Sequence, residues 1–183
     1  TSAGFGTWGY PNANVWGHTI FRGNTISGTS RAISINETNN VTIENNNLSG
    51  NDIGVWIGNS APISFTPTTI SIHNNNISND GIYGVKNEST LVNGNNIVNA
   101  THNWWGDASG PYDNKTLAGT PNYNNPNGRG NSVSSYVDYR PWYKDVAMTA
   151  LSNETPAKPT LLSPIDGVFR HTSDSNSSDW SDV

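Results

Sequence analysis

The sequence predicts an all-β protein built as a solenoid, in which short strands of successive repeats stack on one another. Three observations predict this class: a repeated motif, alternating apolar residues inside each copy, and no amphipathic helical pattern between the copies. The copies are TIFRGNTIS at 19–27, VTIENNNLS at 41–49, ISIHNNNIS at 70–78 and TLVNGNNIV at 90–98. A period of twenty-odd residues is typical of solenoid coils that carry insertions.

Each copy carries an asparagine at the same place, followed two residues later by an apolar residue. The aligned asparagines are spaced by 22, 29 and 20 residues and are Asn24, Asn46, Asn75 and Asn95. Asparagine is a poor strand former, but it tolerates left-handed turns and its amide both donates and accepts hydrogen bonds. The sequence therefore predicts an asparagine ladder, with amides stacked about 4.8 Å apart along one corner of the solenoid.

The pattern inside one copy predicts strands. Val41 and Ile43 point to one side of a strand, while Thr42 and Glu44 point to the other, and Leu48 opens a second apolar element. A third apolar run follows three of the copies, at 32–35, 55–57 and 82–85. Three short strands per repeat predict a parallel β-helix of about four coils. Leucine-rich repeats fit less well, because the copies lack their leucine spacing and helical half.

Two further motifs follow the repeats, NWWGDASGP at 103–111 and YVDYRPW at 136–142. Together with the repeats they resemble right-handed parallel β-helix domains, a family shared by pectin-degrading enzymes, phage tailspikes and secreted surface proteins. The motif pair is similar to the C-terminal end of such domains in bacterial and archaeal surface proteins. The resemblance covers roughly residues 17–143. It implies the fold and an extracellular or cell-surface location more than an activity.

The chain is expected to divide into five segments. They are an N-terminal cap or partial coil at 1–16, the coils at 17–101, a closing segment at 102–145, a linker at 146–159 and extended strands at 160–183. Stack ends need covering, and the predicted C-terminal capping residues are Trp104, Trp105, Tyr136, Tyr139 and Trp142. The chain begins mid-pattern, which indicates a mature or excised part of a longer protein.

The last segment resembles the first strands of a fibronectin type III or immunoglobulin-like module. PTLLSPIDG at 159–167 and DWSD at 179–182 supply at most two strands, whereas such a sandwich needs about seven. The segment is therefore expected either to be an incomplete module or to complete a sheet on a neighbouring copy.

Composition excludes several classes. A net charge of −5 and a pI near 5.1 disfavour nucleic-acid binding. The absence of cysteine excludes a disulfide scaffold, a thiolate nucleophile and cysteine-based zinc sites. No stretch approaches the ~18 apolar residues of a membrane-spanning helix.

Asp52 and Asp80 fall in turns that look equivalent and form the candidate catalytic pair. Paired carboxylates act as acid and base or nucleophile in glycosidases. The further Asp, His and Arg-x-Lys groups of pectin hydrolases find no counterpart here, and Asx residues at turns have a structural role. No catalytic residue is therefore predicted, and this pair is the alternative.

No metal or cofactor is expected. Asp107 and Asp113 beside Gly-rich turns are the alternative, a Ca²⁺ site, but a full calcium-loop pattern is lacking. The histidines His18, His73 and His102 lack a ligand spacing such as His-x-x-x-His.

Two aromatic residues are the candidate carbohydrate-binding or partner surface. Trp56 lies between Val55 and Ile57, so its indole points outward if they face the core. Tyr83 follows Ile82 in the same way on the next coil. Outward rings indicate a ligand, a partner or a covering loop, for which 60–67 is the candidate.

Sequons for N-glycosylation are frequent. The candidates are Asn36, Asn40, Asn47, Asn76, Asn87, Asn99, Asn114, Asn153 and Asn176. An Asn-rich chain makes many sequons by chance, so their number alone shows little.

The expected function is that of a non-enzymatic extracellular structural protein. It would be a β-helix scaffold of a surface array, filament or adhesin, N-glycosylated and self-associating through 160–183. The alternative is a carbohydrate-binding or polysaccharide-cleaving module that uses Trp56, Tyr83 and the Asp52/Asp80 turns.

Overall fold

The computed structural model describes residues 4–8, 18–36, 40–58, 70–88, 97–115, 121 and 123–152. These residues form strands and turns, and none of them lies in a helix that could cross a membrane. The strands in chain order are β1 (Phe5–Trp8), β2 (Thr19–Arg22), β3 (Thr25–Ile26), β4 (Arg31–Asn36), β5 (Val41–Glu44), β6 (Asn47–Ser49), β7 (Ile53–Gly58), β8 (Ile70–His73), β9 (Asn76–Ser78), β10 (Tyr83–Asn87), β11 (Val98–Asn99), β12 (Pro111–Tyr112), β13 (Gly130–Ser132) and β14 (Val137–Asp138).

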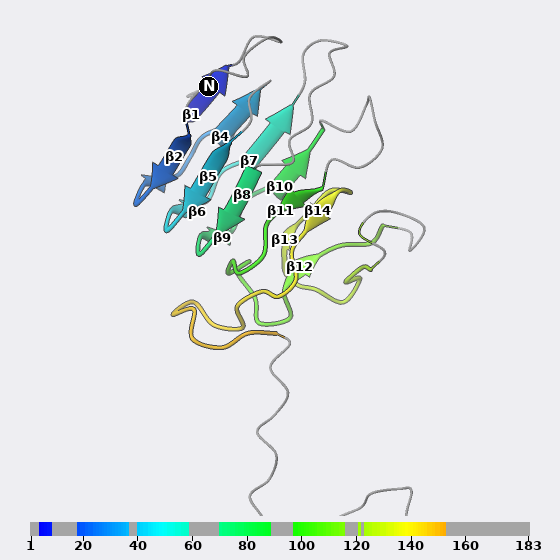
Figure 1. The fold of residues 1–183 in the computed structure, drawn as a ribbon. Helices are drawn as coiled ribbons and strands as arrows, with labels where there is room; N and C mark the ends of the chain where they lie inside the picture. Colours follow the sequence, from blue (N-terminus) through cyan, green and yellow to red (C-terminus); the bar gives the residue numbers. More distant parts are fainter. Residues whose placement is uncertain are drawn as a thin grey trace, which may run out of the picture.

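Three parallel sheets form the walls of the molecule (Figure 1). Sheet A has the order β1-β4-β7-β10, sheet B the order β14-β11-β8-β5-β2, and sheet C the order β3-β6-β9. Along the chain, each coil contributes one strand to sheet B, one to sheet C and one to sheet A, and the next coil begins with a strand that pairs with the first. The predicted all-β, parallel β-helix fold is thereby confirmed.

Register across the coils follows the repeats. Val41 pairs with Thr19 on one side and with Ile70 on the other, while Leu48 pairs with Ile26 and Ile77. Each strand of sheet B alternates inward and outward side chains, so β5 has Val41 and Ile43 fully buried. Because equivalent positions are in register, the inward side chains of successive coils stack on one another and form continuous columns in the core. Apolar burial contributes about 25 cal/mol per Å² to stability.

The corners of the coils are made by residues in the left-handed conformation. Between sheets B and C these residues are Gly23 (φ 70°), Asn45 (φ 55°), Asn74 (φ 56°) and His102 (φ 56°). Between sheets C and A they are Gly28 (φ 68°), Gly50 (φ 76°), Asn79 (φ 57°) and Gly106 (φ 94°). Glycine and asparagine adopt this conformation most readily, which explains why they occupy seven of these eight corner positions.

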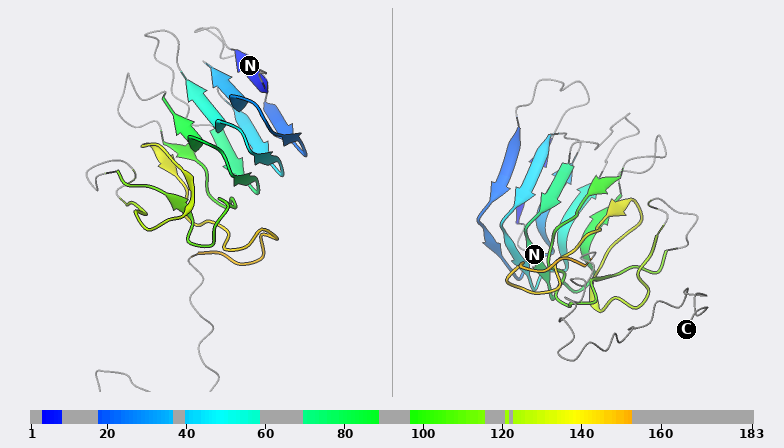
Figure 2. Two further views of the ribbon diagram at one scale, coloured as in Figure 1. Left: turned by 180° about the vertical axis from the view of Figure 1, so that it is seen from behind. Right: turned by 60° about the horizontal axis from the view of Figure 1, so that its bottom comes forward.

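The fourth coil extends past the boundary expected at residue 101. After β11, Trp104 bridges to Asn76 and continues sheet C, and Val133 bridges to Val85 and continues sheet A. β14 then pairs with β11 and begins a fifth turn in sheet B. The described residues 106–115 and 123–129, which include β12, lie in an insertion between the sheet C and sheet A parts of this coil. Figure 2 shows it and the segment 139–152 at the end of the stack away from β1.

Trp105 and Tyr139 close this end from within. Both side chains are fully buried and belong to the central core, and Trp142 packs against it from outside. The other two aromatics expected as capping residues, Trp104 and Tyr136, are half-buried. The expected strands at 160–183 and the covering loop at 60–67 lie outside the described residues.

Candidate functional site

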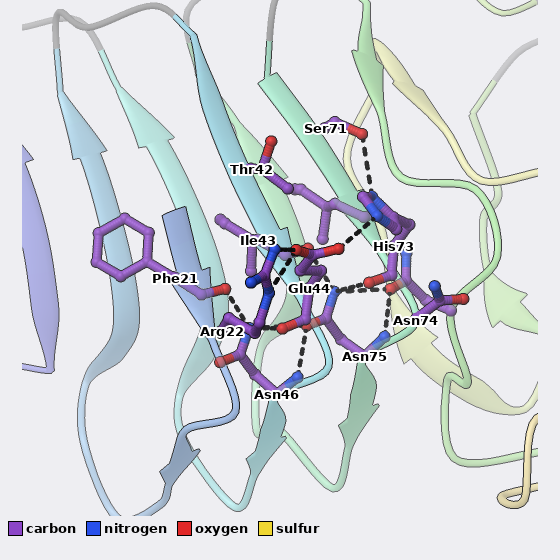
Figure 3. A network of polar contacts seen from close by, with 12 residues as sticks. Phe21, Arg22, Thr42, Ile43, Glu44, Asn46, Ser71, His73, Asn74 and Asn75 are labelled. Atoms are coloured by element: carbon purple, nitrogen blue, oxygen red, sulfur yellow. Dashed lines mark hydrogen bonds and ion pairs between the residues drawn. The ribbon is translucent and has the colours of Figure 1, made fainter. Parts of the chain in front are cut away.

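The first site is a ladder of amides at the corner between sheets B and C (Figure 3). The Oδ1 atom of Asn75 accepts hydrogen bonds from the backbone N (2.9 Å) and Nδ2 (2.9 Å) of Asn46. Asn24 makes the same pair of bonds to Asn46, at 2.9 Å each. Each rung therefore presents one acceptor that is used twice by the coil before it.

The same amides also satisfy the backbone. Nδ2 of Asn75 donates to the carbonyl of Ile43 on the preceding coil and to that of His73 on its own coil, both at 2.9 Å. Asn75 is fully buried. Buried carbonyls without a donor are costly, so these side chains replace the strand hydrogen bonds that are lost where the chain turns.

The fourth rung is Asn103, a correction of the expected ladder. Oδ1 of Asn103 accepts from the backbone N and Nδ2 of Asn75, both at 3.0 Å. Asn95, the rung expected from the repeat at 90–98, lies outside the described residues. Because Asn99 pairs with Ser71, the fourth copy is VNATHNWWG at 98–106. Ala100 and Trp105 occupy inward positions held by isoleucine in the coil before, which concealed the alignment.

A second ladder, missed by the sequence reading, runs along the corner between sheets C and A. Oδ1 of Asn51 accepts from the backbone N (3.2 Å) and Oγ1 (2.9 Å) of Thr29. Asp80 takes the next rung, where its Oδ1 accepts from the backbone N (2.9 Å) and Nδ2 (3.2 Å) of Asn51. Nδ2 of Asn131 donates to Oδ2 of Asp80 at 2.8 Å. The sequence carries a signal for the first three members, because Thr29, Asn51 and Asp80 each follow a glycine or asparagine in the left-handed conformation.

This ladder separates the candidate carboxylate pair. Asp80 stacks on Asn51, whereas Asp52 is exposed and one position further along the chain. The turns looked equivalent because Asn-Asp occurs in both, but Ser49 pairs with Ser78, so Asn51 matches Asp80. Burial raises the pKa of Asp80 to about 6, against the hydrogen bonds from Asn51 and Asn131 that lower it. Asp80 is therefore a member of the second ladder and does not lie in register with Asp52.

The outer face of sheet B carries a charged row across three coils (Figure 3). Arg22, Glu44 and His73 are in register on β2, β5 and β8. Nε of Arg22 donates to Oε1 of Glu44 at 2.7 Å, and Nε2 of His73 lies 3.0 Å from Oε2. The hydrogen bond from Arg22 holds the pKa of Glu44 below its usual value. Arg22 is exposed while Glu44 and His73 are half-buried, and their contacts tie three neighbouring coils together.

The outer face of sheet A carries the candidate aromatic surface. Trp56 is half-buried, and its ring occupies the space beside Gly58, where a Cβ would come within 1.8 Å of it. The Arg31 guanidinium lies 3.9 Å from the centroid of the ring. Nε1 of Trp56 donates to Glu88 at 2.6 Å. Tyr83 pairs with Ile53 and not with Trp56. The two rings are therefore offset along the strands and not in one row, a correction of the expected alignment.

The residues of the alternative Ca²⁺ site are engaged separately. Asp107 accepts from the backbone N (2.9 Å) and hydroxyl (2.6 Å) of Ser109. Asp113 is buried, forms an ion pair with Lys115 and accepts from the Tyr139 hydroxyl at 2.9 Å. Among the described residues, no group of three or more acidic or histidine side chains could hold a metal ion.

The structure sorts the sequons by exposure. Asn36 and Asn87 are buried at 3% and 5% relative exposure and Asn76 is half-buried. The exposed ones are Asn40, Asn47, Asn99 and Asn114. Asn47 and Asn76 stand in register, as their shared repeat position predicts, and Nδ2 of Asn76 donates to Oδ1 of Asn47 at 3.0 Å. Asn153 and Asn176 lie outside the described residues.

These features define a parallel β-helix whose corners are held by side-chain ladders. A family model described as "Right handed beta helix region" matches residues 8–134, more than half of the chain. The chain therefore belongs to the right-handed β-helix family. Comparisons with curated proteins and with solved structures return no match. Family membership establishes the fold, and the activity has to be argued from the residues.

Proposed function

We propose that this protein is a non-enzymatic structural protein, a rigid β-helix scaffold of an extracellular surface array, filament or adhesin. The observation that carries the proposal is the use of polar side chains along the corners. Asn24, Asn46, Asn75 and Asn103 hydrogen-bond coil to coil without a break, and Asp80 serves the second ladder. The side-chain amides and the Asp80 carboxylate are thus engaged in hydrogen bonds that hold the coils together.

A cell-surface location and N-glycosylation belong to the same proposal. They are supported by the resemblance of the NWWG and YVDYRPW motifs to surface proteins and by the four exposed sequons. Self-association is assigned to residues 160–183, whose sequence resembles the first strands of a sandwich module. Strands from one copy would complete a sheet on the next, a contact that propagates without closing.

Imaging of the purified full chain tests this proposal. Size exclusion and negative-stain microscopy are expected to show rods or arrays at high protein concentration. A variant that ends at Ser152 is the matched control, because the described core contacts end there, and it is expected to stay monomeric and folded. A strictly monomeric full chain would contradict the scaffold role.

The alternative function is a carbohydrate-binding or polysaccharide-cleaving module. The observation that favours it is the partly exposed Trp56 ring on sheet A, beside the cations of Arg31 and Lys86, because aromatic faces and cations suit acidic sugars. Titration with a polyuronate separates the two. Binding that Trp56→Ala abolishes, with turnover that Asp80→Asn abolishes, would place the alternative first.

A further inference from the structure

The sequon Asn99-Ala100-Thr101 combines an exposed asparagine with a hydrogen bond between its own residues. Asn99 ends β11 on the outer face of sheet B, in register with Ser71 on one side and Asp138 on the other. Ala100 between them is fully buried, so it anchors the sequon to the core. The Asn99 side chain is exposed. The sequon is therefore presented on a rigid strand end.

The sequon's threonine is bonded to its own asparagine. Oγ1 of Thr101 donates to Oδ1 of Asn99 at 2.9 Å, and the backbone N of Thr101 donates to the same atom at 3.2 Å. Nδ1 of His102 lies 3.0 Å from Oγ1 and holds the hydroxyl in place. Both bonds go to the amide oxygen, and Nδ2 makes no hydrogen bond within the described part of the chain. The amide oxygen is thus polarised while the nitrogen faces solvent.

The sequons at Asn47, Asn76 and Asn87 lack this combination of features. Nδ2 of Asn87 donates to the carbonyl of Tyr136 at 3.0 Å, and the Asn87 side chain is buried. Nδ2 of Asn76 donates to Asn47. Asn47 is exposed, but the hydroxyl of its own Ser49 accepts from Ser78 at 3.3 Å and does not bond Asn47. Exposure, a free nitrogen and the internal Thr-to-Asn bond coincide at Asn99.

We propose that Asn99 is a preformed acceptor for N-glycosylation in the folded protein, and that the Asn76 and Asn87 sequons are silent there. The donor is an oligosaccharide linked to a lipid through phosphate. Transfer forms a bond between Nδ2 and the anomeric carbon, breaks the bond from that carbon to the phosphate oxygen, and releases one amide proton. The glycan would stand on sheet B and leave the Trp56 face of sheet A bare. This site rests on the proposed extracellular function.

Glycosylation of the purified, folded chain in vitro tests the proposal. The protein is incubated with a lipid-linked oligosaccharide and a transferase that requires only Asn-X-Ser/Thr, and glycopeptides are mapped by mass spectrometry. Modification at Asn99 is expected to be about tenfold faster than at Asn47, because a preorganised acceptor does not have to be ordered on binding. Heat-denatured chain is expected to lose this preference and to be modified at Asn76 and Asn87.

Substitutions at the sequon serve as controls. Thr101→Ser retains the hydroxyl and is expected to keep modification at Asn99, whereas Thr101→Ala abolishes it and leaves Asn47 unchanged. Equal rates at Asn99 and Asn47 in the folded protein, or modification of Asn87 there, would overturn the proposal. So would no modification of the folded chain while a sequon peptide is modified. None of these outcomes depends on self-association, so a failed scaffold role is distinguishable.

Discussion

The buried amide of Asn75 shows how single residues hold this molecule together. Its nitrogen serves the carbonyls of Ile43 and His73 as well as Oδ1 of Asn103. Three acceptors therefore share the two hydrogens of one side-chain nitrogen at the place where strand pairing stops. This explains why asparagine stands here although it forms strands poorly.

Asn75→Ala is expected to lower the free energy of unfolding by about 3 kcal/mol, because each buried acceptor left without a donor costs about 1–3 kcal/mol and some acquire water. Chemical denaturation monitored by tryptophan fluorescence measures the change. The matched control is Asn47→Ala on the exposed side of the same corner, expected to change stability by at most about 0.5 kcal/mol. Similar losses for both variants would contradict the role assigned to the ladder.

Asp80 supplies a pH-dependent prediction at the same scale. Its pKa in the folded protein is about 6, above the usual 3.8, because burial disfavours the charge. The folded state thus binds the proton more tightly than the unfolded state. The stability contributed by protonated Asp80 is fully present below pH 3.8 and is lost as the pH rises through about 6.

Asp80→Asn is therefore expected to stabilise the protein by about 1–2 kcal/mol at pH 8, a value reduced for the partial exposure of the site. At pH 3.5 the variant and the parent should differ little, because asparagine resembles the protonated acid. Denaturant unfolding at both pH values is the measurement. If the free energies of unfolding of the two proteins changed in parallel between these pH values, the charge of Asp80 would not destabilise the folded state.

At the scale of elements, one large side chain, that of Trp105, lies where the fourth coil packs on the third. Trp105 is fully buried where the neighbouring coil has Ile77, and a Cβ at Gly84 would come within 3.1 Å of its ring. The backbone carbonyl of Trp105 also accepts from the backbone N of Asn131 at 2.8 Å. β10 and β13 therefore meet around this indole.

Trp105→Ala is expected to cost about 3–5 kcal/mol, the usual loss for removing a buried aromatic side chain. The damage should be local, so amide hydrogen exchange is expected to accelerate in 123–143 more than in β5. Tyr112→Ala, which removes an exposed aromatic of the same segment, is the control and should leave both quantities nearly unchanged. Uniform acceleration across the chain would mean that the coils and the closing segment unfold together.

At the scale of the whole molecule, coils contact only their neighbours, so stability is distributed along the stack. Among the described strands, β2 pairs only with β5, whereas β5 pairs with both β2 and β8. Phe5 on β1, which pairs with the buried Ile33, is 53% exposed. The end of the stack that holds β1–β3 therefore presents a less protected edge than its centre.

Hydrogen exchange of the isolated chain is expected to be slowest in β5 and β8 and faster in β2, because edge strands open at lower free-energy cost. If copies assemble through this end, protection of β2 should rise with protein concentration while that of β5 stays constant. The variant that ends at Ser152 supplies the unassembled reference. Equal protection of β2 and β5 in that variant would contradict a graded stack.

Most of the fold and the first three rungs could be predicted from the sequence because their signals are local. Alternation in Val41–Glu44 reports which side chains face inward, and an asparagine after a left-handed residue reports a corner. The second ladder carries a similar signal, but its members Asn51 and Asp80 differ in residue type, and the sequence alone aligns Asp80 with Asp52 instead.

By itself, the sequence determined that this chain is a parallel β-helix with asparagine corners, since those properties depend on spacing within about ten residues. Only the tertiary structure decided that Asn103 is the fourth rung, that Asp80 bonds Asn51, and that Tyr83 is offset from Trp56. The physical reason is that register between coils is set by strand pairing across some thirty residues. Insertions of unequal length lie between the coils, and Trp105 stands where the other coils have Ile26, Leu48 and Ile77.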